Sequence, residues 1–156
     1  MSTISNSSNA TENDLCVQGT ALYLGDLCRS QLTALQMCFS GTPSPLTIPS
    51  ATDQQQGEAD MVQLNLGLQF LNPSLECEER VRPFLCLHIF GLCDSNNTHH
   101  TTLRHECTEL RDNVCAREWS TAVDFLPIGT LPVCENLPDL TDECNNGRSA
   151  QLHACN

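Results

Sequence analysis

The stretch Cys77–Cys93, with the sequence CEERVRPFLCLHIFGLC, decides the fold, because it places three cysteines on or beside an apolar run. Cysteines in such a setting are metal ligands, nucleophiles or halves of disulfides. A zinc site takes pairs of ligands from one short turn. The chain has no CxxC pair, and its 5 histidines form no HxxxH or CxxxH cluster. The spacing therefore predicts a disulfide framework, with no metal and no other cofactor.

Composition places the chain in an oxidising compartment. It has 156 residues, which is typical of one domain, and 11 cysteines, far more than a reduced cytosolic domain carries. Three N-glycosylation sequons, at Asn6, Asn9 and Asn96, agree with this. We expect an extracellular or cell-surface location. Residues 1–15 lack the basic and apolar regions of a signal peptide, so we expect the leader not to be part of this chain.

The net charge of −12 limits the partners. An acidic surface repels nucleic acid and anionic lipid headgroups, whereas a basic partner protein is compatible with it. No run of 18 apolar residues is present, so we expect any membrane tether to lie in parts of the protein outside this chain.

Apolar spacing predicts several helices. One is expected near 29–39 and the clearest one over 101–119, where apolar residues and two cysteines share a face. Residues 58–71 fit a strand or a helix, and length together with a capping box from Asp53 to Gln56 favours the helix. Pro83 is expected in the first turn of a short buried helix.

The remaining segments read as loops or extended chain. Residues 41–57 and 124–140 contain several prolines, and 94–101 is polar and is expected to be a surface loop. These patterns predict three parts, which are a disordered, glycosylated tail at 1–14, one domain at 15–144 and a linker or C-terminal tail at 145–156.

The pattern Cys77-x8-Cys86-x6-Cys93 resembles the centre of the Frizzled-type cysteine-rich domain. The segment RPFLCLHIFGLC, the Cys134-Glu-Asn-Leu-Pro ending and the QQQGEAD start of a Leu-rich helix are also similar to that family. The single Cys107, fourteen residues after Cys93, looks more like the Smoothened branch. The resemblance covers about 16–144. It implies a mainly α, disulfide-rich fold with about four helices and short extended or β segments.

The resemblance also implies a set of disulfides. Carried onto this chain, the pairs are Cys16–Cys144, Cys28–Cys93, Cys38–Cys86, Cys77–Cys115 and Cys107–Cys134. Cys155 is left over, either unpaired or bonded to a second chain as a dimer, and Cys16–Cys155 is an alternative pair. Cys86 and Cys93 would then tie to the N-terminal third, and Cys77 to the last helix.

The function implied is extracellular ligand recognition for a membrane receptor or co-receptor. Such domains have a hydrophobic groove that takes a Wnt acyl chain in Frizzleds and a sterol in Smoothened, so the expected partner is an extracellular protein ligand or a lipid. The alternative is a lipid-independent interaction module of an adhesion protein, co-receptor or channel auxiliary subunit. The matching residues that are candidates for the groove lining, or otherwise for core, are Met61, Leu64, Leu68, Leu71, Phe125, Leu126 and Ile128.

An enzyme is not expected. His88 lies within an apolar run and reads as a core histidine, and His99 and His100 read as part of a solvated loop. There is no GxSxG motif and no free cysteine beside a base.

Overall fold

The structure is a computed structural model that describes residues 12–40, 45–95, 97–127 and 129–138. The predicted linker at 145–156 and most of the predicted tail at 1–14 lie outside these residues, although 12–14 already belong to a helix. Several predicted features also lie outside them, namely the sequons at Asn6, Asn9 and Asn96, together with Ile128, Cys144 and Cys155.

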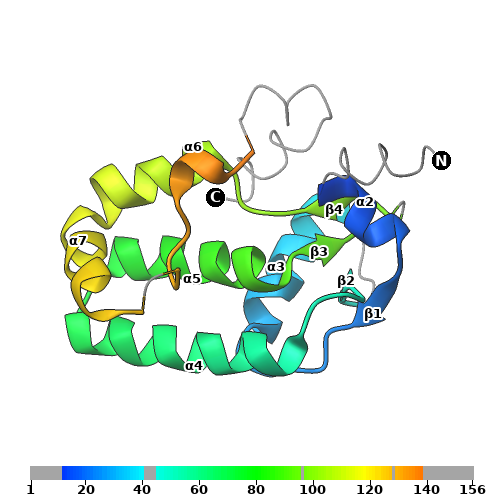
Figure 1. The fold of residues 1–156 in the computed structure, drawn as a ribbon, viewed down its shortest axis with the longest axis horizontal. Helices are drawn as coiled ribbons and strands as arrows, with labels where there is room; N and C mark the ends of the chain where they lie inside the picture. The colour runs from blue at the N-terminus through cyan, green and yellow to red at the C-terminus, as the bar shows by residue number, and fades with distance from the viewer. Residues whose placement is uncertain (1–11, 41–44, 96, 128, 139–156) are drawn as a thin grey trace.

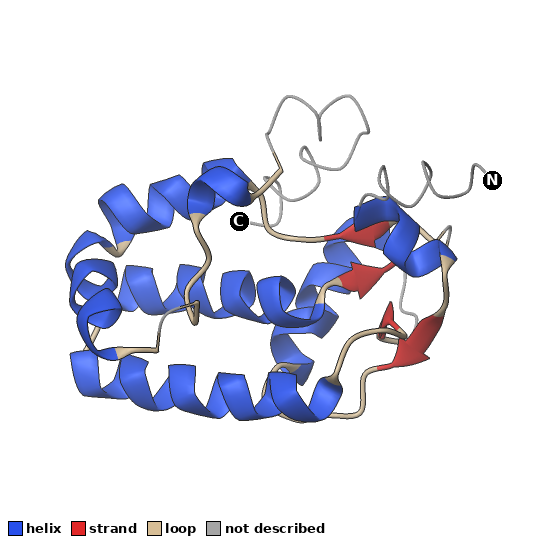
Figure 2. Ribbon diagram, viewed as in Figure 1, coloured by secondary structure: helices blue, strands red, loops and turns tan. Residues whose placement is uncertain are grey.

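Helices make up most of the described chain (Figures 1 and 2). They are α2 (Glu12–Val17), α3 (Arg29–Ser40), α4 (Gln54–Leu71), α5 (Leu75–Phe90), α6 (Arg104–Glu109) and α7 (Ala116–Phe125), with a π turn η1 (Leu110–Val114) and a 3-10 turn η2 (Cys134–Asn136). The expected mainly α, disulfide-rich fold is confirmed.

Four short strands form one antiparallel sheet in the order β1-β2-β3-β4. They are β1 (Thr20–Leu22), β2 (Thr47–Pro49), β3 (Leu92–Cys93) and β4 (His99–His100). Ala21 pairs with Ile48, Thr47 with Cys93 and Leu92 with His100. The sheet lies at the end of the molecule where α4 begins and α5 ends, beside α2 and α3 (Figure 1).

The ambiguous 58–71 segment is helical, and its helix α4 begins at Gln54. The backbone N–H of Gln56 donates to Asp53 Oδ1 at 3.1 Å, which satisfies one of the free N–H groups of the first turn. The Gln56 side chain donates to Asp60 at 3.0 Å instead of returning to Asp53, so half of the predicted capping box forms. Asn72, with φ of 53°, ends the helix in the left-handed conformation.

Helix α5 is longer than predicted and begins at Leu75, so Pro83 lies inside it rather than in its first turn. The Ser74 hydroxyl caps this earlier start by accepting from Cys77 N at 3.1 Å. An ion pair one turn apart, Arg82 to Glu78 at 2.8 Å, supports the charged first half. These local interactions, together with the disulfides that hold the helix from Cys77 and Cys86, outweigh the hydrogen bond that proline removes.

The helix predicted over 101–119 is real but interrupted. It begins at Arg104, and the π turn η1 separates α6 from α7. In a regular α-helix, Cys107 and Cys115 would be rotated by roughly 80° relative to each other. The wider π turn absorbs one residue and brings the two cysteines closer in phase. Both are fully buried, as the shared apolar face predicted.

Four disulfides join the described cysteines, and their pairs are Cys16–Cys93, Cys28–Cys86, Cys77–Cys115 and Cys107–Cys134. The last two are the pairs that the resemblance implies. Cys38 is also disulfide-bonded, and its partner is none of these eight residues.

The first three cysteines pair differently from the implied scheme. The structure has Cys28–Cys86 in place of Cys38–Cys86, and Cys16–Cys93 in place of Cys28–Cys93 and Cys16–Cys144. Cys38 follows Cys28 by about 15 Å along α3, too far for both to reach the same part of α5. The outline nevertheless agrees with the expectation, since Cys86 and Cys93 tie to the N-terminal third and Cys77 to the junction with α7.

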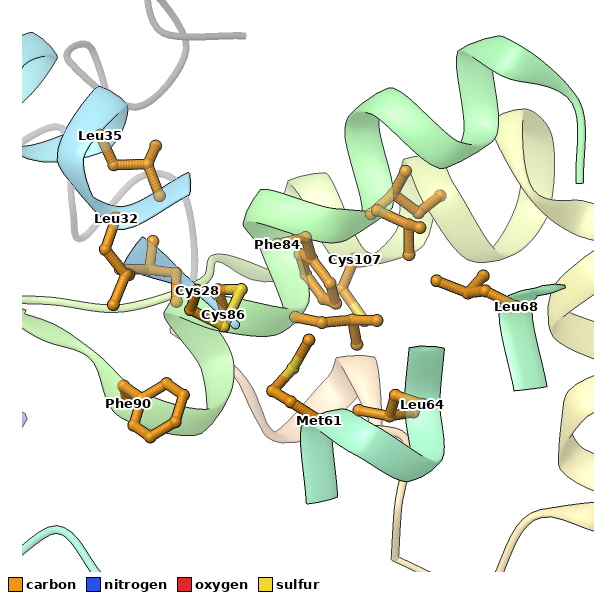
Figure 3. Close-up of a cluster of buried hydrophobic side chains, with 14 of the residues drawn as sticks. Cys28, Leu32, Leu35, Met61, Leu64, Leu68, Phe84, Cys86, Phe90 and Cys107 are labelled. Atoms are coloured by element: carbon orange, nitrogen blue, oxygen red, sulfur yellow. A yellow bond between two sulfur atoms is a disulfide. The ribbon is translucent and has the colours of Figure 1, made fainter. Parts of the chain in front are cut away.

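The core surrounds α5, whose second half is apolar on nearly every side. Phe84, Leu85, Leu87 and Phe90 are all buried. Figure 3 shows Phe84 and the Cys28–Cys86 bond between Leu32 of α3 and Met61 of α4. Each fully buried side chain of this kind contributes about 1.5–3 kcal/mol of transfer free energy, so α5 is the element on which the others pack.

Candidate functional site

An apolar cavity of about 30 Å³ lies between α4, α5, α7 and the segment after α7. We call this cavity with its lining the apolar groove, and residues 126–127 and 129–133 the arm. The surface that the cavity exposes is entirely apolar. Its volume corresponds to about one water molecule, so the side chains of the domain itself fill the groove.

The lining comes from four parts of the chain. It consists of Leu64, Gly67, Leu68 and Leu71 of α4; Cys77, Val81 and Leu85 of α5; Cys115, Glu118, Trp119 and Ala122 at and within α7; and Leu126 and Leu131 of the arm. On each of the three helices these residues are spaced mostly three or four apart, which places them on one helical face.

Four of the seven sequence-derived candidates line this groove, namely Leu64, Leu68, Leu71 and Leu126. Met61 belongs to the core and is 2% exposed. Phe125 lies outside the cavity on the surface, and Ile128 is outside the described residues. Whether the four residues contact a ligand stays a prediction.

Sequence reasoning missed the walls that α5 and α7 contribute. Val81 and Leu85 read only as core of a buried helix, since nothing in a single sequence separates a core face from a cavity face. Trp119 carried a signal, because it is the only tryptophan of the chain and lies one turn after Cys115. Its indole ring packs on Phe84, with 6.3 Å between ring centroids.

Exposed apolar side chains lie next to the groove. Phe70 is 81% exposed and Leu66 is 62% exposed on the outer side of α4. The Phe70 ring meets Phe125 of α7 edge to face, with centroids 5.9 Å apart. We call Leu66, Phe70 and Phe125 the apolar ridge. Surface apolar residues that contact one another in this way mark interaction sites more often than single ones do.

A polar cleft of about 540 Å³ lies on the other side of the arm. Asp53, Asp60 and His88 line it from α4 and α5, and Gly129 and Thr130 line it from the arm. Burial lowers the pKa of His88 below 6.5, because the charged imidazolium is poorly solvated there. His88 is therefore neutral at pH 7, in agreement with its reading as a core histidine.

The two adjacent histidines lie in a different environment from the predicted solvated loop. His99 and His100 form β4 and are each 4% exposed. His100 Nε2 is 3.1 Å from Asp94 Oδ2. Pairing with β3 buries both rings, and a two-residue strand is too short for alternation to reveal it.

The described residues contain no group of three or more His, Cys, Asp or Glu side chains that could hold a metal ion. In the same part of the chain, no helix is both long and apolar enough to cross a membrane. The chemistry that the described surface offers is therefore apolar burial in the groove and on the ridge.

Comparison with protein families identifies one match, in which residues 23–141 fit the family described as Fz domain. The match begins at Tyr23, just after β1, and covers most of the chain, including every residue that lines the apolar groove. A comparison with curated proteins finds no match.

Proposed function

Because the chain belongs to the Fz domain family, a family of cysteine-rich extracellular ligand-binding modules, we propose that it is the ligand-recognition domain of a membrane receptor or co-receptor. We propose further that the apolar groove takes the lipid part of its ligand, a sterol or an acyl chain. Tethering to a membrane through other parts of the protein belongs to the same proposal.

The observation that carries the lipid proposal is a wholly apolar concave surface assembled from four separate segments. A ligand that buries methylene groups there gains about 0.8 kcal/mol for each one. The apolar ridge continues this surface outward, because Phe125 lies beside both Gly67 of the groove and Phe70. A lipid that reaches the groove from the ridge would stay out of water along its path.

Quenching of Trp119 fluorescence tests this proposal directly. Trp119 lines the groove and is the only tryptophan, so a fatty acid brominated along its chain or a brominated sterol should quench its emission on binding. We expect saturable quenching by one of these probes at concentrations where bromide ion gives none. Saturable binding that leaves the Trp119 emission unchanged would place the lipid elsewhere.

A matched pair of variants controls for non-specific adsorption. Leu68→Gln places a polar group in the lining and should abolish quenching, because the buried amide would lack a partner. Leu24→Gln changes a leucine that is 76% exposed and outside the lining, so quenching should be unchanged.

A second candidate function is lipid-independent protein recognition. The small volume of the groove favours it, because a sterol or acyl chain enters only if the lining moves. In that case the apolar ridge is the binding surface. Protein that has its disulfides intact and shows no quenching with either probe, while Phe70→Ser weakens binding of a protein ligand, would favour this candidate.

Two finer features remain predictions. The spacing around Cys107 favours the Smoothened branch, for which binding of the sterol probe rather than the acyl probe would be the expected result. Dimerisation through Cys155 predicts a covalent dimer on non-reducing gels that Cys155→Ser removes.

A further inference from the structure

We propose that Leu126 is an internal plug of the apolar groove, whose side chain occupies the position that an unbranched acyl chain takes on binding. Gly67, on the opposite wall, keeps that position wide enough for a chain to pass. This inference rests on the proposed lipid-binding function and specifies how the same groove opens.

Gly67 lies in the middle of α4, a helix of 18 residues. A Cβ atom built there would be 3.7 Å from Leu126 Cδ2 and 3.9 Å from Phe125 Cε2, which is ordinary van der Waals contact. The closed packing therefore leaves room for alanine, which is also the better helix former. The missing methyl group leaves a notch in the α4 wall that Leu126 covers.

The other glycine of α4 provides the contrast. A Cβ at Gly57 would meet the Phe90 ring at 2.6 Å, so close packing explains that glycine. At Gly67 no such contact exists, and the free space lies between the groove and the ridge.

Leu126 is the wall of the groove that moves most easily. Its backbone N–H donates to Ala122 of its own helix, and its half-buried side chain can change rotamer without breaking this bond. In the described part of the arm, the hydrogen bonds join Thr130 to Pro127 and none reaches α4 or α5. The α5 and α7 walls, by contrast, are cross-linked by Cys77–Cys115.

The geometry points to an unbranched acyl chain rather than a sterol. The groove exposes no polar atom, so a sterol hydroxyl that entered it would lose its hydrogen bonds to water. The notch at Gly67 is bounded by the backbone of one helix and a single side chain, which suits a narrow chain. Phe125, which contacts both this notch and Phe70, would guide the chain inward from the ridge.

Two substitutions on opposite walls test the plug, with the dissociation constant of a brominated acyl probe measured by Trp119 quenching. Leu126→Ala should tighten binding by about fourfold for each further methylene group that the chain buries, and should shift the preference toward longer chains. Gly67→Ala should weaken binding while the domain stays folded. If Leu126→Ala does not fold, Leu126→Val should change the affinity in the same direction by a smaller factor.

The failure of the plug differs from the failure of the proposed function. Wild-type protein that binds the probe, with Leu126→Ala binding equally or more weakly, would make Leu126 an ordinary lining residue and overturn the plug alone. Unchanged affinity in Gly67→Ala would also overturn it. Absence of binding in the wild type and in every variant would overturn both proposals.

Discussion

Glu118 of α7 accepts a hydrogen bond from the backbone N–H of Ser74 at 3.0 Å, so a buried carboxylate holds the start of α5 against α7. Ser74 is also the N-cap of α5, and Cys77, three residues later, bonds Cys115 at the start of α7. One hydrogen bond and one disulfide therefore fix the same joint. The groove opens beside this joint, so its α5 and α7 walls are rigid.

Replacing Glu118 should destabilise the domain in proportion to what happens to the Ser74 N–H. Glu118→Ala leaves this N–H without an acceptor and should lower the free energy of unfolding by about 1–3 kcal/mol. Glu118→Gln keeps an amide oxygen in place and should cost less. Denaturant unfolding measures both, with Glu135→Ala as the control, because the Glu135 side chain is 64% exposed. Equal losses in the two Glu118 variants would contradict this role.

The two glycines of α4 should respond to alanine with opposite signs. Gly57→Ala forces its new methyl group into the buried Phe90 ring and should cost about 1–3 kcal/mol. Gly67→Ala meets only ordinary contacts and should stabilise α4 by about 0.5–1 kcal/mol. Thermal and denaturant unfolding of the pair gives the comparison. A loss of stability in Gly67→Ala would mean that the α4 wall near Leu126 is more tightly packed than these distances indicate.

Tyr23 should titrate far above an ordinary tyrosine. Burial, reinforced by the hydrogen bond that its hydroxyl donates to Glu58, raises its pKa to about 12. The raised pKa stabilises the fold below pH 10, and this contribution is lost as the pH rises from about 10 to 12. Because it is the only tyrosine, tyrosinate absorbance after a rapid pH jump reports on it alone.

Glu58→Gln is the matched variant for this titration. It removes the neighbouring negative charge and keeps an acceptor, so the Tyr23 midpoint should fall but stay above 10, because burial is the larger cause. A midpoint near 10 in the wild type would contradict the buried position of the ring.

Disulfide mapping should find Cys16 with Cys93 and Cys28 with Cys86. Chymotryptic cleavage after Tyr23 separates the first two cysteines, and cleavage after Phe90 separates Cys86 from Cys93. Digestion of denatured, unreduced protein under acidic conditions, with mass spectrometry of the linked peptides, gives the pairing. A peptide that links Cys28 to Cys93 would overturn the pairing described here and restore the one implied by resemblance.

Stability should fall as the pH is lowered through the usual range of histidine titration. Burial lowers the pKa of His88 in the folded protein, so below about pH 6.5 the unfolded chain binds a proton more readily than the folded one. His88→Gln should reduce the loss of stability between about pH 7 and pH 5 relative to the wild type. His105→Gln, at an exposed position, should leave the slope unchanged. An identical slope in His88→Gln would contradict the prediction.

The sequence predicted those elements whose signals are local. The cap from Asp53 and the apolar spacing of α4 belong to one segment, as do the residues of α3. The disulfides from Cys77 and Cys107 followed from resemblance to a family with fixed spacings. The start of α5 was missed because Pro83 looked like a helix start, while the competing cap at Ser74 precedes a charged turn with little apolar pattern.

The rest depended on contacts between distant segments. Cys16, Cys28 and Cys38 outnumber the positions that the resemblance could align, and only the packing of α3 and the sheet decides which of them meets Cys86 or Cys93. Likewise, four apolar residues of the groove were identified from α4 and the arm. Their opposite wall comes from α5 and α7, whose helical faces look the same in the sequence whether they meet a core or a cavity.

The π turn between α6 and α7 makes this part of the chain intolerant of length changes. Deleting one residue within Leu110–Val114 would restore an ordinary α-helix and turn everything after it by roughly 100°. Cys115 would then point away from Cys77, and Trp119 away from Phe84, although no side chain that makes these contacts had been altered. Related chains that keep the Cys77–Cys115 bond should therefore differ from this one by substitution in the segment, and not by insertion or deletion.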